Sequence, residues 1–358
     1  MKVVLVVDSF KGTLSGEKVE EVLATALEKV GIECVKVPVS DGGEGLVDTM
    51  SAMGGEIIRA QVTDPNGGKT IAKYLLKGDL AIIETAQAAG LPLSEKTAAD
   101  TTTYGVGELI LDAEKHGATR FILGLGGSAT NDGGCGMAAA LGCKFYDKDG
   151  QSFIPVGRTL QNIDRIELGR PFDITAFCDV KNPLYGKSGA AYVFAPQKGA
   201  DEKEVQELDL GLMHLNRVFI KQGLGDFNVQ GAGAAGGLGA GVLAFWGGKL
   251  KSGIDAVLDA SDFDECVTNA TYVITGEGKL DSQSFGGKVI DGVIKRSGNA
   301  KVLAVVGTSL IDDSKKYGLE KVFETNPTHK PFDEIKDNAL NDLIICADKV
   351  AAYLGDKK

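Results

Sequence analysis

Long apolar runs are missing from this sequence of 358 residues. A membrane-spanning helix needs roughly 18 to 20 such residues in a row, so we expect no membrane partner. The opening MKVVLVVDSF holds one lysine and a short apolar run that Asp8 interrupts. That pattern is typical of a buried first strand and differs from a signal peptide, so we expect a cytoplasmic protein.

Cysteine pairs, metal motifs and nucleophile motifs are also missing. The six cysteines are scattered without a CxxC pair, which favours reduced core thiols over disulfides or a metal site. His116, His214 and His329 stand alone, without HxxxH or HExxH spacing, and are expected to be surface or satisfied histidines. No serine lies in a GxSxG elbow, so a triad hydrolase has little support.

Positive charge is scarce, because 38 Lys and Arg face 49 Asp and Glu, a formal net charge of -11. Such a chain repels phosphate backbones and has no dense basic cluster, so we expect no nucleic-acid partner. A small anion is still possible as a ligand, since backbone amides and a few placed cations bind one within an acidic protein.

Glycine, in contrast, is abundant: 49 of 358 residues, about twice the typical share of roughly 7%. The glycines are bunched, which indicates close approach of the backbone to something.

The alternation of apolar and amphipathic stretches predicts an α/β fold. In the terminal parts of the chain we expect strands over 3–7, 34–39, 272–275, 302–306 and 322–324, and helices over 15–30, 289–296, 312–317 and 340–354. In the middle we expect strands over 80–84, 120–125, 174–179 and 191–195, helices over 105–115, 201–221 and 237–245, and a hairpin over 144–152. The five terminal strands predict a discontinuous, doubly wound parallel sheet of flavodoxin or Rossmann type, made from residues 1–59 and 269–358. Residues 60–268 would then form a large inserted α/β domain.

Carboxylates, hydroxyls, cations and glycines follow the strands of the predicted first domain. They are Asp8-Ser9-Phe10-Lys11-Gly12-Thr13, Ser40-Asp41-Gly42-Gly43-Glu44-Gly45, Thr275-Gly276-Glu277-Gly278-Lys279-Leu280-Asp281 and Gly307-Thr308. Any one of these segments fits a tight turn with a helix cap. Four of them at the carboxyl ends of parallel strands predict a ligand site.

The middle of the chain contains a longer glycine-rich segment, residues 123–136, between a predicted strand and a helix. Strand, glycine turn and helix start together form a cradle for an anion. The segment is neither a Walker A loop nor a strict GxGxxG. Asn131 and Asp132 at its helix end are suited to Mg²⁺ or a substrate hydroxyl.

Three further segments are ambiguous. Residues 231–241 are almost wholly Gly and Ala, which favours close packing over ligand binding. Residues 179–184 and 195–200 each place a charge or an amide after a predicted strand, and each also fits a turn. The remaining inventory of carboxylates, lysines and amides is that of phosphoryl transfer.

Seven of these motifs, in order along nearly the whole chain, closely resemble the bacterial glycerate kinase family. They are DSFKGTLS (8–15), SDGGEG (40–45), LGLGGSATNDGGCGM (123–137), CDVKNPL (178–184), APQKGA (195–200), GAGAAGGLGAG (231–241) and TGEGKLD (275–281). The resemblance implies ATP-dependent phosphorylation of D-glycerate, a two-domain fold with the active site in the cleft between the domains, and Mg²⁺. Members of this type look like 2-kinases. Val7 and Ser40 depart from the family pattern, which has Pro and often Ala there.

Residue roles follow from chemistry and placement. The candidate catalytic residues are Asp8, Lys11, Asp41, Asp132, Asp179, Lys279 and Asp281, with Asp132 and Asp281 as Mg²⁺ ligands. The candidate substrate-binding or phosphate-binding residues are Ser9, Gly42, Gly43, Glu44, Gly126, Gly127, Ser128, Asn131, Asn182, Gly276 and Glu277. Lys11 and Lys279 would neutralise phosphate oxygens.

Several alternatives remain open. They are a glycerate 3-kinase, a kinase of a related small hydroxy acid, a non-catalytic protein that binds a nucleotide or hydroxy acid, and a dehydrogenase.

Overall fold

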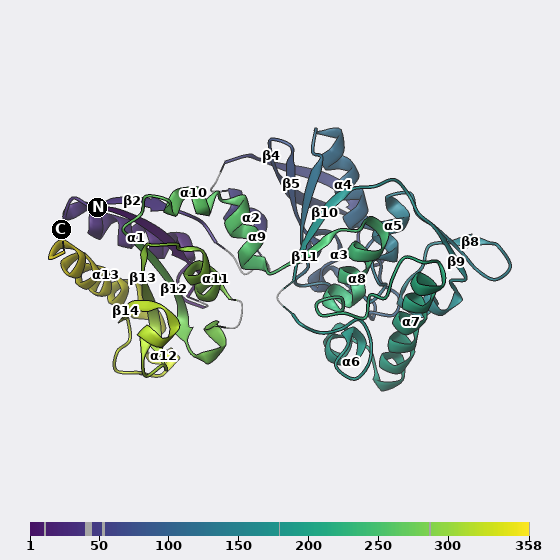
Figure 1. Ribbon diagram of the computed structural model, residues 1–358. Helices are drawn as coiled ribbons and strands as arrows, with labels where there is room; N and C mark the ends of the chain where they lie inside the picture. Colours follow the sequence, from purple (N-terminus) through teal and green to yellow (C-terminus); the bar gives the residue numbers. More distant parts are fainter. Residues whose placement is uncertain (11, 40–44, 52–53, 179, 286–287, 358) are drawn as a thin grey trace. The chain divides into compact units, whose positions relative to one another are not determined.

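The computed structural model describes residues 1–10, 12–39, 45–51, 54–178, 180–285 and 288–357. The chain forms two compact units (Figure 1), unit 1 from Met1–Asp41 and Ser252–Lys358 and unit 2 from Gly42–Lys251. In the part of the chain that is described, no helix is long and apolar enough to cross a membrane.

Unit 1 contains a five-stranded parallel sheet with strands from both ends of the chain. Its strands are β1 (Lys2–Val7), β2 (Glu33–Lys36), β12 (Tyr272–Leu280), β13 (Lys301–Ser309) and β14 (Leu319–Glu324), in the order β14-β13-β12-β1-β2. All four strand pairs are parallel. The expected parallel sheet built from N- and C-terminal strands is therefore confirmed. If its strands are numbered along the chain, the order is 2-1-3-4-5, which is common among open α/β sheets.

Unit 1 also contains helices, most of which have buried apolar residues. They are α1 (Gly16–Lys29), α9 (Gly253–Ala260), α10 (Phe263–Val267), α11 (Val289–Arg296), α12 (Phe332–Ile335) and α13 (Ala339–Gly355), with 3-10 turns η4 (Ser282–Phe285), η5 (Ser314–Tyr317) and η6 (Lys336–Asn338). Ser15 caps α1 by accepting from the Lys18 amide, and Gly31 follows the helix at a φ of 71°. Helices α1 and α13 share one core with alternate residues of β1, including Val3 and Leu5.

Unit 2 contains a six-stranded mixed sheet. Its strands are β3 (Glu56–Thr63), β4 (Lys69–Lys77), β5 (Leu80–Glu84), β6 (Arg120–Gly124), β10 (Asp173–Phe177) and β11 (Lys249–Lys251), in the order β11-β10-β6-β5-β4-β3. The four strands from β11 to β5 are parallel, whereas β4 is antiparallel to both its neighbours. A separate antiparallel sheet contains β7 (Lys144–Tyr146), β8 (Ser152–Phe153) and β9 (Arg165–Glu167), which confirms the expected hairpin.

Most helices of unit 2 contribute apolar residues to one of three cores. They are α2 (Leu46–Ser51), α3 (Thr85–Ala89), α4 (Tyr104–Lys115), α5 (Cys135–Ala140), α6 (Ala190–Phe194), α7 (Glu202–Lys221) and α8 (Ala234–Trp246), with 3-10 turns η1 (Leu91–Leu93), η2 (Gly157–Asn162) and η3 (Pro196–Lys198). All six cysteines are free thiols, as expected.

The structure departs from the sequence predictions at several elements, including the following. The predicted strand over 191–195 is wrong, because these residues lie in helix α6, where Tyr192 and Val193 are exposed. The predicted third strand was too short, since β12 continues to Leu280 and pairs with β13 up to Ser309. The antiparallel pair β3 and β4 was not predicted.

Both boundaries between the units lie earlier in the sequence than expected. They fall between residues 41 and 42 and between 251 and 252, whereas the sequence predicted 59 and 60, and 268 and 269. Strand β3 pairs with β4 of unit 2, and α9 contacts α11 of unit 1. These contacts assign residues 42–59 to unit 2 and residues 252–268 to unit 1.

Candidate functional site

In unit 1, acidic residues gather at the carboxyl edge of the parallel sheet. Asp8 follows β1, where its amide donates to the Gly276 carbonyl at 3.0 Å and its Oδ1 accepts from the Ser9 amide at 2.7 Å. Residues Val7 and Gly276 are register partners, so Asp8 lies beside Glu277 of the neighbouring strand. The edge thus brings together Asp8, Ser9, Gly276 and Glu277, as the sequence predicted.

Glu277 has a raised carboxyl pKa. Burial raises the pKa of its carboxyl, and the charges of Asp8 and Asp281 raise it further, while a hydrogen bond with Ser284 and the charge of Lys288 lower it. Its Oε1 atom is buried and has no hydrogen-bond partner in the described part of the chain. A carboxylate with a raised pKa and a free oxygen is suited to accept a proton or to contact a cation.

Lys279 and Asp281 lie at the end of β12. The Lys279 Nζ is 3.8 Å from a carboxylate oxygen of Asp281, and the side chains are 62% and 29% exposed. The Lys279 side chain is therefore largely open to solvent, whereas the Asp281 amide donates to Ser284 Oγ at 3.0 Å.

In unit 2, the glycine loop (residues 125–134) follows β6 and leads into helix α5. Asp132 is fully buried there, and both its oxygens are occupied. Oδ2 accepts from the Thr103 amide, the Thr103 hydroxyl and the Gly136 amide, and Oδ1 accepts from the Gly134 amide, at 2.8 to 3.2 Å. Burial raises the pKa of Asp132, and these hydrogen bonds oppose the rise. At the start of α5, the amides of Gly134 and Gly136 thus bind the carboxylate of Asp132, whereas the amides predicted to bind an anion lie earlier in the loop, around residues 126–131.

A buried lysine lies under the same loop. Lys198, in η3, is 5% exposed, and its Nζ donates to Ser128 Oγ at 3.0 Å and to the Thr130 carbonyl at 2.8 Å. Burial lowers the pKa of Lys198 to about 7, although the charge of Asp132 opposes this. Buried lysines with lowered pKa values are common at functional sites.

The Gly/Ala segment of residues 231–241 packs backbone to backbone against the glycine loop. The Gly133 amide donates to the Gly236 carbonyl at 3.0 Å. A Cβ at Gly236 would lie 1.9 Å from the Thr130 carbonyl oxygen, and the φ of Gly236 is +65°. Close packing, which the sequence favoured for this segment, is what the structure has.

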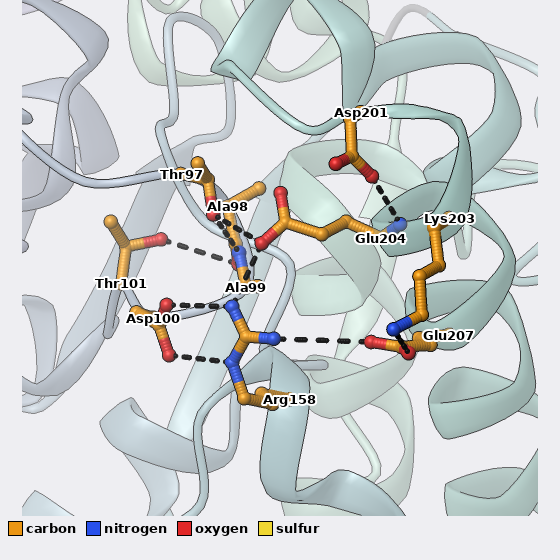
Figure 2. A network of polar contacts seen from close by, with 10 residues as sticks. All are labelled: Thr97, Ala98, Ala99, Asp100, Thr101, Arg158, Asp201, Lys203, Glu204 and Glu207. Carbon is orange, nitrogen blue, oxygen red and sulfur yellow. Dashed lines mark hydrogen bonds and ion pairs between the residues drawn. The ribbon is translucent and has the colours of Figure 1, made fainter.

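Residues 97–103, called the bridging segment below, connect the glycine loop to Lys198. The Ala98 amide donates to the Lys198 carbonyl at 3.1 Å, and Thr101 Oγ1 donates to the Ala129 carbonyl at 3.0 Å. Figure 2 shows the contacts of Arg158. Its guanidinium donates to Asp100 in the bridging segment and also pairs with two glutamates of α7, Glu204 and Glu207, so it links the segment to that helix.

The remaining predicted residues differ in their exposure and in their contacts. Gly126 and Gly127 form an exposed turn, and Asn131 is buried with an unpaired Nδ2. Asn182 donates to the Ser188 carbonyl at 2.7 Å, which is a turn contact. Outside the described residues lie Lys11, Asp41, Gly42, Gly43, Glu44 and Asp179.

Lys198 and Glu84 are two of the buried charged residues that were not predicted. Lys198 was noted only as a charge in a segment that fits a turn, although an isolated lysine among Ala, Pro and Gly was a usable signal. Glu84, at the end of β5, is 2% exposed and accepts from the amides of Gly45 and Val47 at 3.3 and 2.6 Å. Nothing in the sequence distinguished it from the end of an ordinary strand.

Each of the three histidines has a polar contact within the protein. In the described residues, no group of three or more His, Cys, Asp or Glu side chains could hold a metal ion. His214 contacts the Ile163 carbonyl at 2.7 Å and His329 contacts Glu324 at 3.0 Å. These contacts agree with satisfied histidines.

Comparison with known proteins identifies the family. The family model described as "Glycerate kinase family" matches residues 3–355. Glycerate 2-kinase of Escherichia coli (strain K12) is 40% identical over 99% of this chain and 98% of its own length. A glycerate kinase of Bacillus subtilis (strain 168) is 39% identical over 99% and 98%. A crystal structure from Salmonella typhimurium LT2, provisionally named glycerate kinase 2, has a TM-score of 0.87 and 37% identity, and covers 100% of this chain and 99% of its own. The chain therefore belongs to the glycerate kinase family.

Proposed function

We propose that this chain transfers a phosphoryl group from ATP to the 2-hydroxyl of D-glycerate, in the presence of Mg²⁺, to give 2-phospho-D-glycerate and ADP. Membership of the family already makes it a glycerate kinase, a phosphotransferase with an alcohol group as acceptor, and a kinase implies an ATP substrate. The preference for the 2-position is supported by one observation, the near-full-length similarity to E. coli glycerate 2-kinase.

The proposed roles follow the described contacts. In unit 1, Asp8 and Glu277 are the candidates for the base at the substrate hydroxyl, since they adjoin each other at the sheet edge and Glu277 keeps a buried oxygen without a partner. Lys279, exposed at the same edge, is proposed to neutralise phosphate oxygens. Phosphoryl transfer depends mainly on such positioning and charge stabilisation.

The acidic residues of unit 1 fit Mg²⁺ better than Asp132 does. Mg²⁺ commonly keeps several waters and binds through one or two carboxylates and the phosphates of the substrate. The charge of Asp281 raises the pKa of Glu277, and among the described residues one Glu277 oxygen has no hydrogen-bond partner. Asp132 already accepts four hydrogen bonds, so we propose that it orders the glycine loop. When bound, the ion would screen the phosphate charge.

The first experiment is an assay of ADP formation by the purified chain with ATP, Mg²⁺ and D-glycerate. We expect turnover that stops when a chelator removes Mg²⁺, and a product that enolase consumes directly, as it does 2-phosphoglycerate. Phosphorus NMR of the product would identify the isomer independently. If the product is 3-phosphoglycerate, the position is wrong. If L-glycerate or another hydroxy acid is used and D-glycerate is not, the substrate is wrong.

A further inference from the structure

Lys198 is a buried cation without a counter-ion in contact. In the described part of the chain, no carboxylate lies within 4.0 Å of its Nζ, which donates only to Ser128 Oγ and the Thr130 carbonyl. Asp132 is the charged group that faces it most closely, and that carboxylate is already occupied by four donors. Asp100 and Glu204, on neighbouring elements, are paired with Arg158. The positive charge therefore acts on the glycine loop above it.

The loop carries donors that are not used inside the protein. Ser128 Oγ accepts from Lys198, so the Ser128 hydroxyl proton points elsewhere, and among described residues it has no acceptor. In the same part of the chain the amides of Gly126 and Gly127 donate to no protein acceptor, and both glycines are exposed. Two fully buried neighbours, Thr130 Oγ1 and Asn131 Nδ2, also have no hydrogen-bond partner among the described residues. Buried polar groups without partners are uncommon and indicate a functional role or an ordered water.

Both Lys198 and Ser128 are fixed by surrounding structure. The bridging segment bonds to Lys198 at its Ala98 end and to the glycine loop through Thr101 and Thr103. The Leu91 amide donates to the Gly127 carbonyl at 2.9 Å, and the Ala129 amide donates to the Ala89 carbonyl at 2.8 Å, which anchors the other side of the loop to α3 and η1. Arg158, with Asp100 and Glu204, holds the bridging segment in place (Figure 2).

We propose that Lys198 is a positioning residue for an anion subsite in which the Ser128 hydroxyl and the Gly126 and Gly127 amides bind anionic oxygens of a substrate. Lys198 orients the Ser128 hydroxyl outward and supplies positive charge from below, without itself touching the ligand. This proposal rests on the proposed function, because the anion is either the carboxylate of the hydroxy acid or a phosphate of the nucleotide. Carboxylate and phosphate oxygens accept hydrogen bonds from such donors in the same way.

The first test is Lys198→Met, which keeps the apolar stem and removes the charge. We expect KM for one substrate to rise by about tenfold or more, with a smaller change in kcat, because a charge-assisted contribution to ground-state binding is lost. A rise confined to D-glycerate, at saturating ATP, would identify the carboxylate as the anion. A rise confined to ATP, at saturating D-glycerate, would identify a phosphate. If both KM values stay within about twofold of wild type, or if only kcat falls, the proposal is overturned.

The second test is Ser128→Ala, alone and combined with Lys198→Met. If Lys198 acts through Ser128, the single substitutions raise the same KM, and the double variant is much less impaired than the sum of the two effects. Additive effects would contradict the positioning role. Ser128→Ala also decides the matter if Lys198→Met does not fold, because the subsite requires its KM effect independently.

Lys203→Met is the matched control, since Lys203 lies on α7 with its side chain 85% exposed. It should leave both KM values and kcat unchanged. Wild-type turnover separates this proposal from the proposed function. If wild type does not phosphorylate D-glycerate, the proposed function fails, whereas active wild type with unaffected variants rejects only the subsite.

Discussion

Glu20 is a carboxyl group buried on α1 against the end of β1. It is 3% exposed, and its Oε1 accepts from the Val7 amide at 3.1 Å. Strand β2 pairs with β1 only as far as Leu5, so the glutamate supplies the acceptor that a strand would otherwise provide. Burial raises the pKa of Glu20 from 4.5 to about 8, although the Val7 hydrogen bond lowers it.

This raised pKa predicts a pH-dependent loss of stability. The folded state holds the Glu20 proton more tightly than the unfolded state, so the contribution is complete below the unfolded value of 4.5 and is lost as pH rises through about 8. Glu20→Gln remains neutral at every pH. At about pH 9 its free energy of unfolding should exceed that of wild type by on the order of a few kcal/mol, and its urea midpoint should be higher. At about pH 5 the two proteins should differ little.

The control for this substitution is Glu21→Gln. Glu21 is the next residue on α1, where its exposed side chain pairs with Lys18 at 2.7 Å. Glu21→Gln should show the same difference in the free energy of unfolding between the two pH values as wild type does. Equal urea midpoints for Glu20→Gln and wild type at alkaline pH would show that Glu20 is not held neutral.

The roles of single residues were only partly predictable from sequence. Asp8 and Glu277 could be predicted because parallel strands end at one edge, which brings their following residues together. The burial of Lys198 could not be predicted, although the lysine stands out among Ala, Pro and Gly, because that burial depends on the fold of residues 97–103, a segment that the sequence did not single out. Asp132 was assigned to metal binding because sequence does not reveal that Thr103 donates to its Oδ2 and the Gly134 amide to its Oδ1.

At the scale of elements, the glycine loop and the start of α8 pack so closely that position 236 has no room for a side chain. Ala235, Gly236 and Gly237 have φ values of 51°, 65° and 91°, all left-handed. This conformation lets Gly236 approach the Thr130 carbonyl. Left-handed backbone is costly for a residue that has a Cβ. Glycine is therefore required at position 236 for both reasons.

Gly236→Ala should destabilise the chain more than an alanine at another left-handed glycine. The matched control is Gly247→Ala, because Gly247 ends α8 at a φ of +60° and a Cβ there would meet nothing within 4 Å. The control should cost about 1 kcal/mol from the backbone alone. Gly236→Ala should cost about 2 kcal/mol more, since the new methyl group overlaps a carbonyl. Urea unfolding measures both, and equal losses would show that the loop tolerates the methyl group.

Elements with local signals were predictable, and those shaped by neighbours were not. Helices α1 and α7 have polar caps at Ser15 and Asp201, and α11 has the range that was predicted. Strand β12 extends past its apolar run because β13 offers pairing partners up to Ser309. Strand β4 was missed because lysines interrupt its apolar pattern, and α6 was mistaken for a strand because its short apolar run shows no clear period.

For the whole molecule, the two units differ in how the chain builds them. Unit 2 is one continuous segment with its own sheet and cores, whereas unit 1 needs both ends of the chain. A fragment of residues 42–251 should therefore fold alone, with cooperative thermal unfolding and a native near-UV circular dichroism spectrum.

The matched control is a fragment with the boundaries expected from sequence, residues 60–268. It lacks the start of β3 and all of α2, and it carries α9 and α10 without the α11 contacts of unit 1. It should unfold at lower temperature or aggregate. If the two fragments are equally stable, the division of the chain between the units is not energetically important.

The discontinuity of unit 1 also affects synthesis on the ribosome. Strand β1 pairs with β12, with Val3 opposite Tyr272, so its central partner is translated only after all of unit 2. At about 5–20 residues per second, that delay is roughly ten to fifty seconds. During this interval β1 can contact α1 and β2, but its apolar residues lack the cover of β12 and α13, while unit 2 is already able to fold. The N-terminal segment is therefore the part of the newly made protein with most need of a chaperone.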